Sequence, residues 1–170
     1  YKGMKKIKKQ ITNNLIMVRP EHFDFNYETA KNNHFQKKEK KLSKEKILRN
    51  AKNEFDNLYN NLIKNKINVN VFNEKKKVRT TDSVFPNNWI SLHQDGSVYV
   101  YPMFSENRRK ERRFDIIEKL KKQFEIKRVI DLSYFEKESV FLEGTGSMIL
   151  DRQNKICYAA LSDRTNLIAL

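Results

Sequence analysis

The stretch SVFPNNWISLHQDGSVYVYP, residues 83–102, decides the fold of this chain. In it, Asp95-Gly96 lies between two runs rich in β-branched and aromatic residues, a combination that is a strong signal for a hairpin. We therefore predict a hairpin whose two strands cover residues 83–93 and 97–102.

A helix and a returning strand are predicted directly after this hairpin. Within residues 108–124, the apolar side chains at Phe114, Ile117, Leu120 and Phe124 recur at helical spacing. Residues 126–132 then form a short apolar run typical of a strand. The complete unit is thus strand, strand, helix, strand.

Partial copies of this unit are predicted on both sides. Upstream, we expect a strand at residues 14–19, a helix that begins near Ser43 as its N-cap, and a strand at residues 67–71. The helix carries an apolar stripe of Ile47, Leu48, Ala51, Phe55, Leu58, Tyr59 and Leu62. Downstream, strands are expected at residues 140–151 and 156–161. Such repetition predicts an α/β fold of the propeller-like or layered kind.

The chain is strongly basic, with 35 Lys and Arg against 21 Asp and Glu and a net charge of +14. Residues 31–52 hold nine basic and two acidic side chains, which is +7 and half of the total. Such a run is more often a solvated surface than a polyanion site. No apolar run is long enough to span a membrane. We therefore do not expect nucleic acid to be the main partner, and we expect no membrane-spanning segment.

Cys157 is the only cysteine. A lone thiol forms no internal disulfide and lacks the spacing of a zinc site, so a reducing compartment, cytoplasmic or organellar, is expected. No phosphate loop or dinucleotide motif is present, and we expect neither a metal nor a cofactor. We predict that Cys157 is a packed core thiol in a strand.

Four polar clusters stand where the predicted strands end. They are DSVFPNNW (82–89), NRRKERR (107–113), FLEGTGS (141–147) and LSDRTN (161–166). Each alone has an ordinary structural explanation: a satisfied turn, a solvated basic turn or a hairpin bulge. An arginine after a strand can also grip a carboxylate through two hydrogen bonds.

Together and in this order, the clusters resemble the superfamily of arginine deiminases and dimethylarginine dimethylaminohydrolases. The upstream segments MVRP (17–20), ETAKNNHFQ (28–36) and EFD (54–56) are similar to its citrulline utilisation hydrolases. The resemblance covers roughly residues 14–166. It implies a five-bladed α/β propeller of ββαβ modules, of which this chain supplies about half.

The resemblance also implies residue roles, carried over by motif. Asp82 and Glu143 match carboxylates that bind the planar head of the substrate, and Glu143 is expected in the catalytic group. Arg108 and Arg164 match arginines that hold the α-carboxylate. Asn88 stands where guanidine-cleaving members have a second acid. Since an amide can both donate and accept, Asn88 favours a neutral ureido group and hence citrulline.

The family reaction also uses a Cys nucleophile and a His general acid/base. Cys157 and the three histidines do not match those motifs, so we expect both groups outside these 170 residues. The predicted organisation is a basic extension at 1–13 and a partial propeller at 14–170, with its C-terminal part missing.

Three hypotheses follow from the sequence. The chain is part of a C–N hydrolase for citrulline or an arginine derivative, completed by the missing half or by a partner chain. Alternatively, it is a noncatalytic half-propeller that serves as a structural or binding subunit, because an open sheet edge needs a partner. The third hypothesis is nucleic-acid binding by the basic surface.

Overall fold

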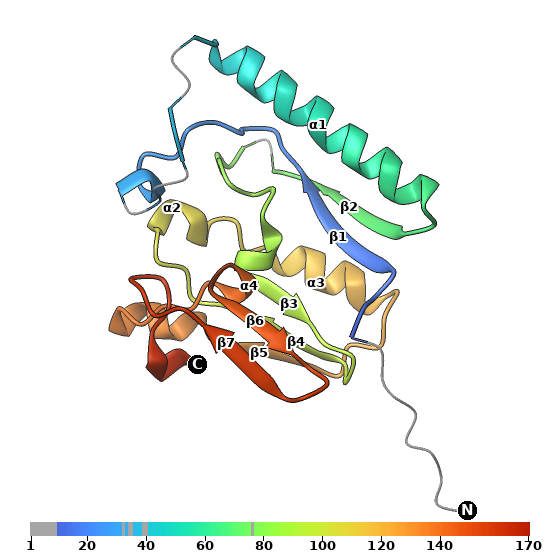
Figure 1. Cartoon of the computed structure of the whole chain (residues 1–170), viewed down its shortest axis with the longest axis vertical. Helices are drawn as coiled ribbons and strands as arrows, with labels where there is room; N and C mark the ends of the chain where they lie inside the picture. The colour runs from blue at the N-terminus through green and yellow to red at the C-terminus, as the bar shows by residue number, and fades with distance from the viewer. Residues whose placement is uncertain (1–9, 32, 34–35, 39–40, 76) are drawn as a thin grey trace, which may run out of the picture.

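The computed structural model describes residues 10–31, 33, 36–38, 41–75 and 77–170. Its strands form three separate groups arranged as one complete repeat flanked by two partial repeats, with helices between the strands (Figure 1). The predicted α/β class is confirmed. The described residues form no closed barrel. Most of the predicted extension at 1–13 lies outside the described residues.

The first group joins β1 (Asn14–Arg19) to β2 (Asn68–Asn73) in parallel, with Asn14 opposite Asn68. The helix α1 (Lys44–Lys64) connects them and lies alongside both strands (Figure 1). As predicted, Ser43 is its N-cap, and the Ser43 hydroxyl accepts a hydrogen bond from the Lys46 N–H at 3.3 Å. The helical periodicity of the sequence thus correctly predicted the helix that connects these two parallel strands.

The apolar stripe of α1 is only half-buried. Six of its seven predicted members are partly covered, whereas Leu58 is 53% exposed. No residue of α1 is fully buried. The helix therefore rests on one side of a two-stranded pair and leaves most of its surface open.

The complete repeat comprises β3 (Ile90–Leu92), β4 (Ser97–Val100), α3 (Phe114–Lys121) and β5 (Arg128–Asp131). β3 and β4 are antiparallel, and β4 and β5 are parallel. The hairpin turn contains Gly96 at φ +83°, a conformation that glycine adopts without strain. The main core cluster lies between these strands and α3; it consists of Val18, Trp89, Ile90, Val98, Val100, Met103, Ile116, Ile117 and Leu120.

The predicted helix over 108–124 is wrong in its extent. It is divided into α2 (Glu106–Arg109) and α3, and Arg113 between them has an extended backbone. Arg113 donates to both oxygens of Asp115 and to the Asn73 carbonyl, and these bonds fix it outside a helix. α3 therefore begins at Phe114, which is 49% exposed instead of packed.

Two predicted strands are also shorter than expected. In the segment 83–93, the turn at Pro86–Asn88 precedes β3, because proline lacks the N–H that a strand ladder needs. In the segment 140–151, the short helix α4 (Gly144–Ser147) precedes β6 (Met148–Asp151). Both departures place polar side chains in turns immediately before a strand.

The last group is the hairpin of β6 and β7 (Ile156–Ala159). All four β7 residues are exposed, because β7 pairs only with β6 among the described strands. The prediction of a packed thiol at Cys157 is therefore wrong: Cys157 is exposed, with its Sγ 3.8 Å from Met148 Sδ. Remaining elements are the 3₁₀ turns Thr29–Lys31, Ser133–Glu138 and Leu167–Ala169.

Candidate functional site

Glu143 occupies the centre of the polar cluster. It precedes α4 and is 1% exposed. Its Oε1 accepts a hydrogen bond from the Phe104 N–H at 3.2 Å, which fixes one side of the carboxylate. Its Oε2 lies 3.7 Å from Arg108 Nη1, 3.3 Å from Arg164 Nη1 and 3.5 Å from Asn88 Nδ2. One carboxylate oxygen therefore faces three donors from distant parts of the chain.

Arg108 enters the cluster from α2. It is 4% exposed and is held by Glu111, one helical turn later. Both Glu111 oxygens lie within 3.2 Å of Nε, and Oε2 lies 2.9 Å from Nη2. Asp82 adds its carbonyl at 3.4 Å from Nη2 and its Oδ2 at 3.8 Å from Nε. Arg108 is thus surrounded by carboxylates.

Asp82 is fixed by a hydrogen bond from a residue in the loop that follows β1. The Asn26 side chain, 1% exposed, donates to Asp82 Oδ2 at 2.5 Å and accepts from Asn107 Nδ2 at 2.6 Å. The Glu28 carboxylate accepts from the Asn107 N–H at 3.0 Å. This amide chain ties together the loop, the turn before β3 and the start of α2.

Arg164 completes the cluster from the segment after β7. Its Nη1 donates to Glu143, and its Nη2 donates to the Thr29 carbonyl at 3.4 Å. The Glu143 N–H donates to the Arg164 carbonyl, so side chains and backbone of the two residues are coupled. The Arg164 side chain is 19% exposed, so it is more accessible to solvent than the Glu143 side chain with which it pairs.

The structure brings together the five residues singled out from the sequence, namely Asp82, Asn88, Arg108, Glu143 and Arg164. Sequence reasoning gave no individual role to Asn107 and Glu111, although both stand in the cluster 107–113, and it missed Asn26. The spacing of Arg108 and Glu111, three residues apart, was a signal for an intrahelical pair. For Asn26 the sequence offered no comparable signal, because the partners that join it to the cluster, Asp82 and Asn107, are more than fifty residues away.

Charge in the cluster is unbalanced when every acid is ionised. Asp82, Glu111 and Glu143 are three carboxylates, whereas Arg108 and Arg164 are two guanidinium groups. Burial is the main cause that raises the pKa of Glu111 to about 7, and the attraction of Arg108 opposes it. Asp82 and Glu143 raise the pKa of Glu111 further. A proton on Glu111 or a cationic ligand would restore neutrality.

The raised pKa of Glu111 predicts a pH-dependent stability. Its unfolded value is 4.5, so the folded state binds the extra proton between pH 4.5 and about 7, and stability falls as the pH rises through that window. Glu111→Gln cannot titrate. As the pH rises from 4.5 to 8, the unfolding free energy of the natural chain should fall by about 3 kcal/mol relative to that of the variant. Urea unfolding at several pH values measures this shift, and parallel pH curves for the two proteins would contradict it.

Two glycines of α4 lie against the turn that carries Asn88. A Cβ at Gly146 would lie 2.2 Å from Asn88 Nδ2, the mobile end of a side chain. A Cβ at Gly144, which has φ +44°, would lie 2.3 Å from the Asn87 carbonyl oxygen. Close approach of backbone to backbone at this point therefore requires glycine.

We expect different outcomes from alanine at these two positions. Gly144→Ala should lower the unfolding free energy by about 1–3 kcal/mol, because the backbone is strained and cannot give way. Gly146→Ala should change stability by less than about 1 kcal/mol but displace Asn88 from Glu143. Thermal unfolding checks the first expectation, and the Asn88 side-chain amide resonances in an NMR spectrum check the second. Equal destabilisation by both would contradict the distinction.

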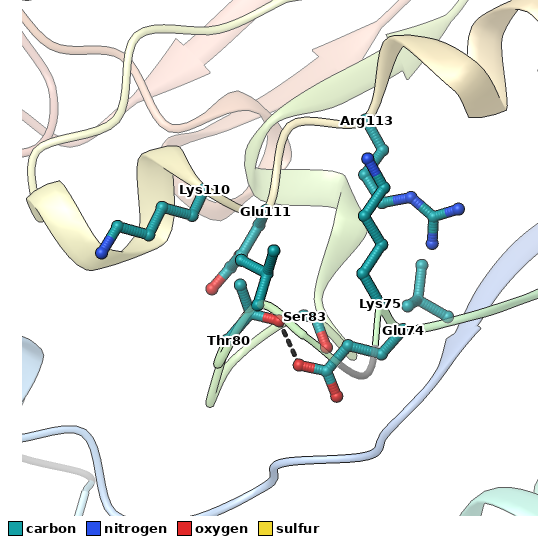
Figure 2. A pocket seen from close by; sticks show the side chains of 9 residues that line it. Glu74, Lys75, Thr80, Ser83, Lys110, Glu111 and Arg113 are labelled. Carbon is teal, nitrogen blue, oxygen red and sulfur yellow. Dashed lines mark hydrogen bonds between the residues drawn. The ribbon is translucent and has the colours of Figure 1, made fainter.

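A separate hollow lies between Glu111, Val18 of β1 and the segment that follows β2. Its polar lining includes Glu74, Thr80, Ser83 and Arg113 (Figure 2). The Thr80 hydroxyl donates to Glu74, while the Lys110 amino group points away from them (Figure 2).

In the described ranges, no group of three or more His, Cys, Asp or Glu side chains is arranged to hold a metal ion. No helix in the described part of the chain has the length and apolar character to cross a membrane.

Comparison with protein families gives one match: a family described as N,N dimethylarginine dimethylhydrolase, eukaryotic, over residues 19–170. A comparison with curated proteins gives no match. Among solved structures, the apo form of ArgZ, an arginine dihydrolase from the ornithine-ammonia cycle in cyanobacteria, is 20% identical with a TM-score of 0.61. The alignment covers 91% of this chain and 21% of ArgZ.

Two further structures are similar. Unliganded AgrE is 22% identical with a TM-score of 0.62, over 91% of this chain and 20% of AgrE. A dimethylarginine dimethylaminohydrolase variant, solved as an adduct with S-methyl-L-thiocitrulline, is 20% identical with a TM-score of 0.56. That alignment covers 89% of this chain and 51% of the hydrolase. This chain therefore spans about half of the hydrolase and about a fifth of ArgZ and AgrE, and at these identities the likeness establishes the fold alone.

Proposed function

The chain belongs to the family described as eukaryotic N,N dimethylarginine dimethylhydrolases, and from this premise we propose that it is one part of a hydrolase acting on a carbon–nitrogen bond of citrulline or a related arginine derivative. One observation carries the proposal. Asp82, Asn88, Arg108, Glu143 and Arg164, separated by up to 82 positions in the sequence, meet around a single carboxylate.

The chemistry of these groups suits an amino acid with a planar nitrogenous head. Glu143 and Asp82 would accept hydrogen bonds from the N–H groups of the head, with Glu143 in the catalytic group. Arg108 and Arg164 would bind the α-carboxylate, since a guanidinium presents paired donors to a carboxylate. Anchoring the far end of the substrate in this way holds the head group against Glu143 and lowers the entropic cost of reaction.

Two features of the site favour different head groups. The Asn88 amide can donate to the oxygen of a neutral ureido group, which favours citrulline. The excess of one carboxylate over the two arginines favours a guanidinium cation when Glu111 is ionised. Citrulline remains our first choice because Asn88 lies directly beside Glu143, whereas a proton on Glu111 already satisfies the charge balance.

We also propose that a thiol and an imidazole from outside these 170 residues perform the covalent step. The thiolate would add to the carbon of the head group, and the amine would leave with a proton from the imidazole. Water would then hydrolyse the covalent thiouronium-type or related acyl intermediate. Cys157 is on the exposed strand β7, and none of its described contacts joins it to the cluster.

The same proposal includes a five-bladed α/β propeller of ββαβ modules, to which this chain contributes about half. Internal comparison supports it. β6 and β7 correspond in order to β3 and β4, but β7 pairs only with β6 among the described strands, whereas β4 also pairs with β5. A further parallel strand would fit along β7.

The surface beside β7 supports a partner at this place. Exposed apolar side chains gather in and after the β6–β7 hairpin: Ile149, Ile156, Tyr158, Leu161, Leu167, Ile168 and Leu170. A concentration of exposed apolar side chains in one segment is typical of a contact site. We propose that the remaining blades, in the same chain or in a partner chain, cover it. The same surface favours the second candidate function, a noncatalytic half-propeller that acts as a binding subunit.

An intact-mass measurement and an assay on the native material separate the two candidates. The substrates are citrulline, arginine and dimethylarginine. Ornithine released from citrulline by a species heavier than 20.4 kDa would support the hydrolase. A 20.4 kDa species that is inert on all three, with its natural partners present, would sink the hydrolase and leave the binding subunit.

A further inference from the structure

Glu111 holds one edge of the Arg108 guanidinium. Its Oε1 and Oε2 lie 3.1 and 3.2 Å from Nε, and Oε2 lies 2.9 Å from Nη2. Both partners are 4% exposed, so water does not compete for these bonds. The Asp82 carbonyl, 3.4 Å from Nη2, adds a further acceptor on the same edge. Nε and Nη2 are therefore fully occupied by the protein.

The remaining nitrogen, Nη1, has a different environment. It lies 3.7 Å from Glu143 Oε2, and in the described part of the chain it makes no hydrogen bond. Arg164 reaches the same Glu143 oxygen from the other side. Because the guanidinium is planar, fixing Nε and Nη2 also fixes the direction in which Nη1 points. That direction is toward the place where both arginines converge.

We propose that Glu111 is a positioning residue, which holds Arg108 so that Nη1 faces the α-carboxylate of the bound amino acid. This inference rests on the proposed function, in which Arg108 binds that carboxylate. Without Glu111, the long Arg108 side chain could turn its paired donors to Asp82 or Glu143 instead. Orientation supplied in advance lowers the entropic cost of binding.

The ionisation of Glu111 should then affect ligand binding. The charged groups that face it are Arg108 from α2, Asp82 from the turn before β3 and Glu143 from the turn before α4. Its other side borders the hollow whose charged lining consists of Glu74, Lys75, Lys110 and Arg113 (Figure 2). With its pKa raised to about 7, mainly by burial, Glu111 is ionised at pH 8 and largely protonated at pH 6. Its hold on Arg108 weakens as the proton binds.

Calorimetric binding to the full chain tests the proposal with two pairs of ligands. L-arginine is compared with agmatine, and L-citrulline with N-carbamoylputrescine; the second member of each pair lacks the carboxylate. At pH 8, Glu111→Gln should lower the affinity for whichever amino acid binds by about ten-fold. The affinity for its decarboxylated partner should stay within about two-fold of the natural chain's value. Affinity of the natural chain should fall between pH 8 and 6, and that of the variant should not.

Glu118→Gln is the matched control, because Glu118 forms an exposed pair with Lys121 at the same three-residue spacing. It should leave all affinities unchanged. If Glu111→Gln fails to unfold cooperatively, Glu111→Asp keeps the charge but shortens the reach, and it should show the same selective loss.

The outcomes that overturn the idea are distinct. If the natural chain, together with the groups that complete the site, binds none of the four ligands, the proposed function and this inference fall together. If it binds an amino acid and both Glu111 variants bind it equally well, only the positioning role is overturned. Equal weakening of both members of a pair would show a merely structural role and would also overturn it.

Discussion

Replacement of Arg108 by methionine should lower the free energy of unfolding by about 3–5 kcal/mol at pH 8. Methionine fills a similar volume but leaves Glu111, Glu143 and Asp82 without their shared cation. Glu111 and Glu143 are 4% and 1% exposed, so water cannot replace the lost partner. A buried carboxylate without a partner must either remain charged at high cost or bind a proton.

The loss should also depend on pH, which separates it from a packing defect. Removal of Arg108 takes away the main attraction that lowers the pKa of Glu111, so that pKa should rise beyond about 7. The destabilisation is then smaller at pH 5, where Glu111 is protonated in both proteins, than at pH 8. Denaturant unfolding at the two pH values measures both effects.

Arg128→Met provides the control for this experiment. Arg128 pairs with Asp95 at 3.0 Å, but the two side chains are 62% and 56% exposed. Exposed pairs contribute about 0–1 kcal/mol, so this variant should stay close to the natural chain. A loss of less than about 1 kcal/mol for Arg108→Met would refute the central place given to Arg108.

Features with a local cause could be predicted from the sequence. The N-cap at Ser43, the turn at Asp95-Gly96 and the strand at residues 14–19 depend on neighbours within a few positions, and all three were confirmed. The prediction of one helix over 108–124 was wrong, because the apolar spacing begins only at Phe114 and does not fix where the helix starts. The interaction that ends it joins Arg113 to the Asn73 carbonyl, 40 residues away.

The site shows the same division between local and distant causes. The family resemblance carried by four polar clusters identified residues that meet around Glu143. The supporting groups were missed: Asn26 reaches Asp82 across 56 residues, and no local pattern distinguishes it from the many other asparagines of this chain. Exposure of Cys157 could not be predicted either, since an apolar, β-branched strand sequence does not reveal whether a neighbouring strand covers it.

Glu143→Gln is expected to reduce hydrolysis of the preferred substrate by at least about 10²-fold, provided the chain is assayed with the groups that complete the site. The change keeps the volume and can keep the hydrogen bond from the Phe104 N–H to Oε1. At the other side, however, the new amide would direct N–H donors at Arg108, Arg164 and Asn88, which already present donors to Oε2. Four sets of donors would then converge where one carboxylate now balances them.

The exposed Glu138 supplies the matched control, since Glu138→Gln removes the same charge from the surface and should leave the rate unchanged. Steady-state rates, together with thermal unfolding, decide the result. If Glu143→Gln unfolds at a lower temperature yet keeps its rate when folded, Glu143 is a structural counter-ion for the two arginines. If the rate collapses while the affinity for the substrate is retained, the carboxylate acts on the reacting head group. The second outcome is expected because Oε2, alone among the described carboxylate oxygens, lies within 4 Å of both arginines and of the Asn88 amide.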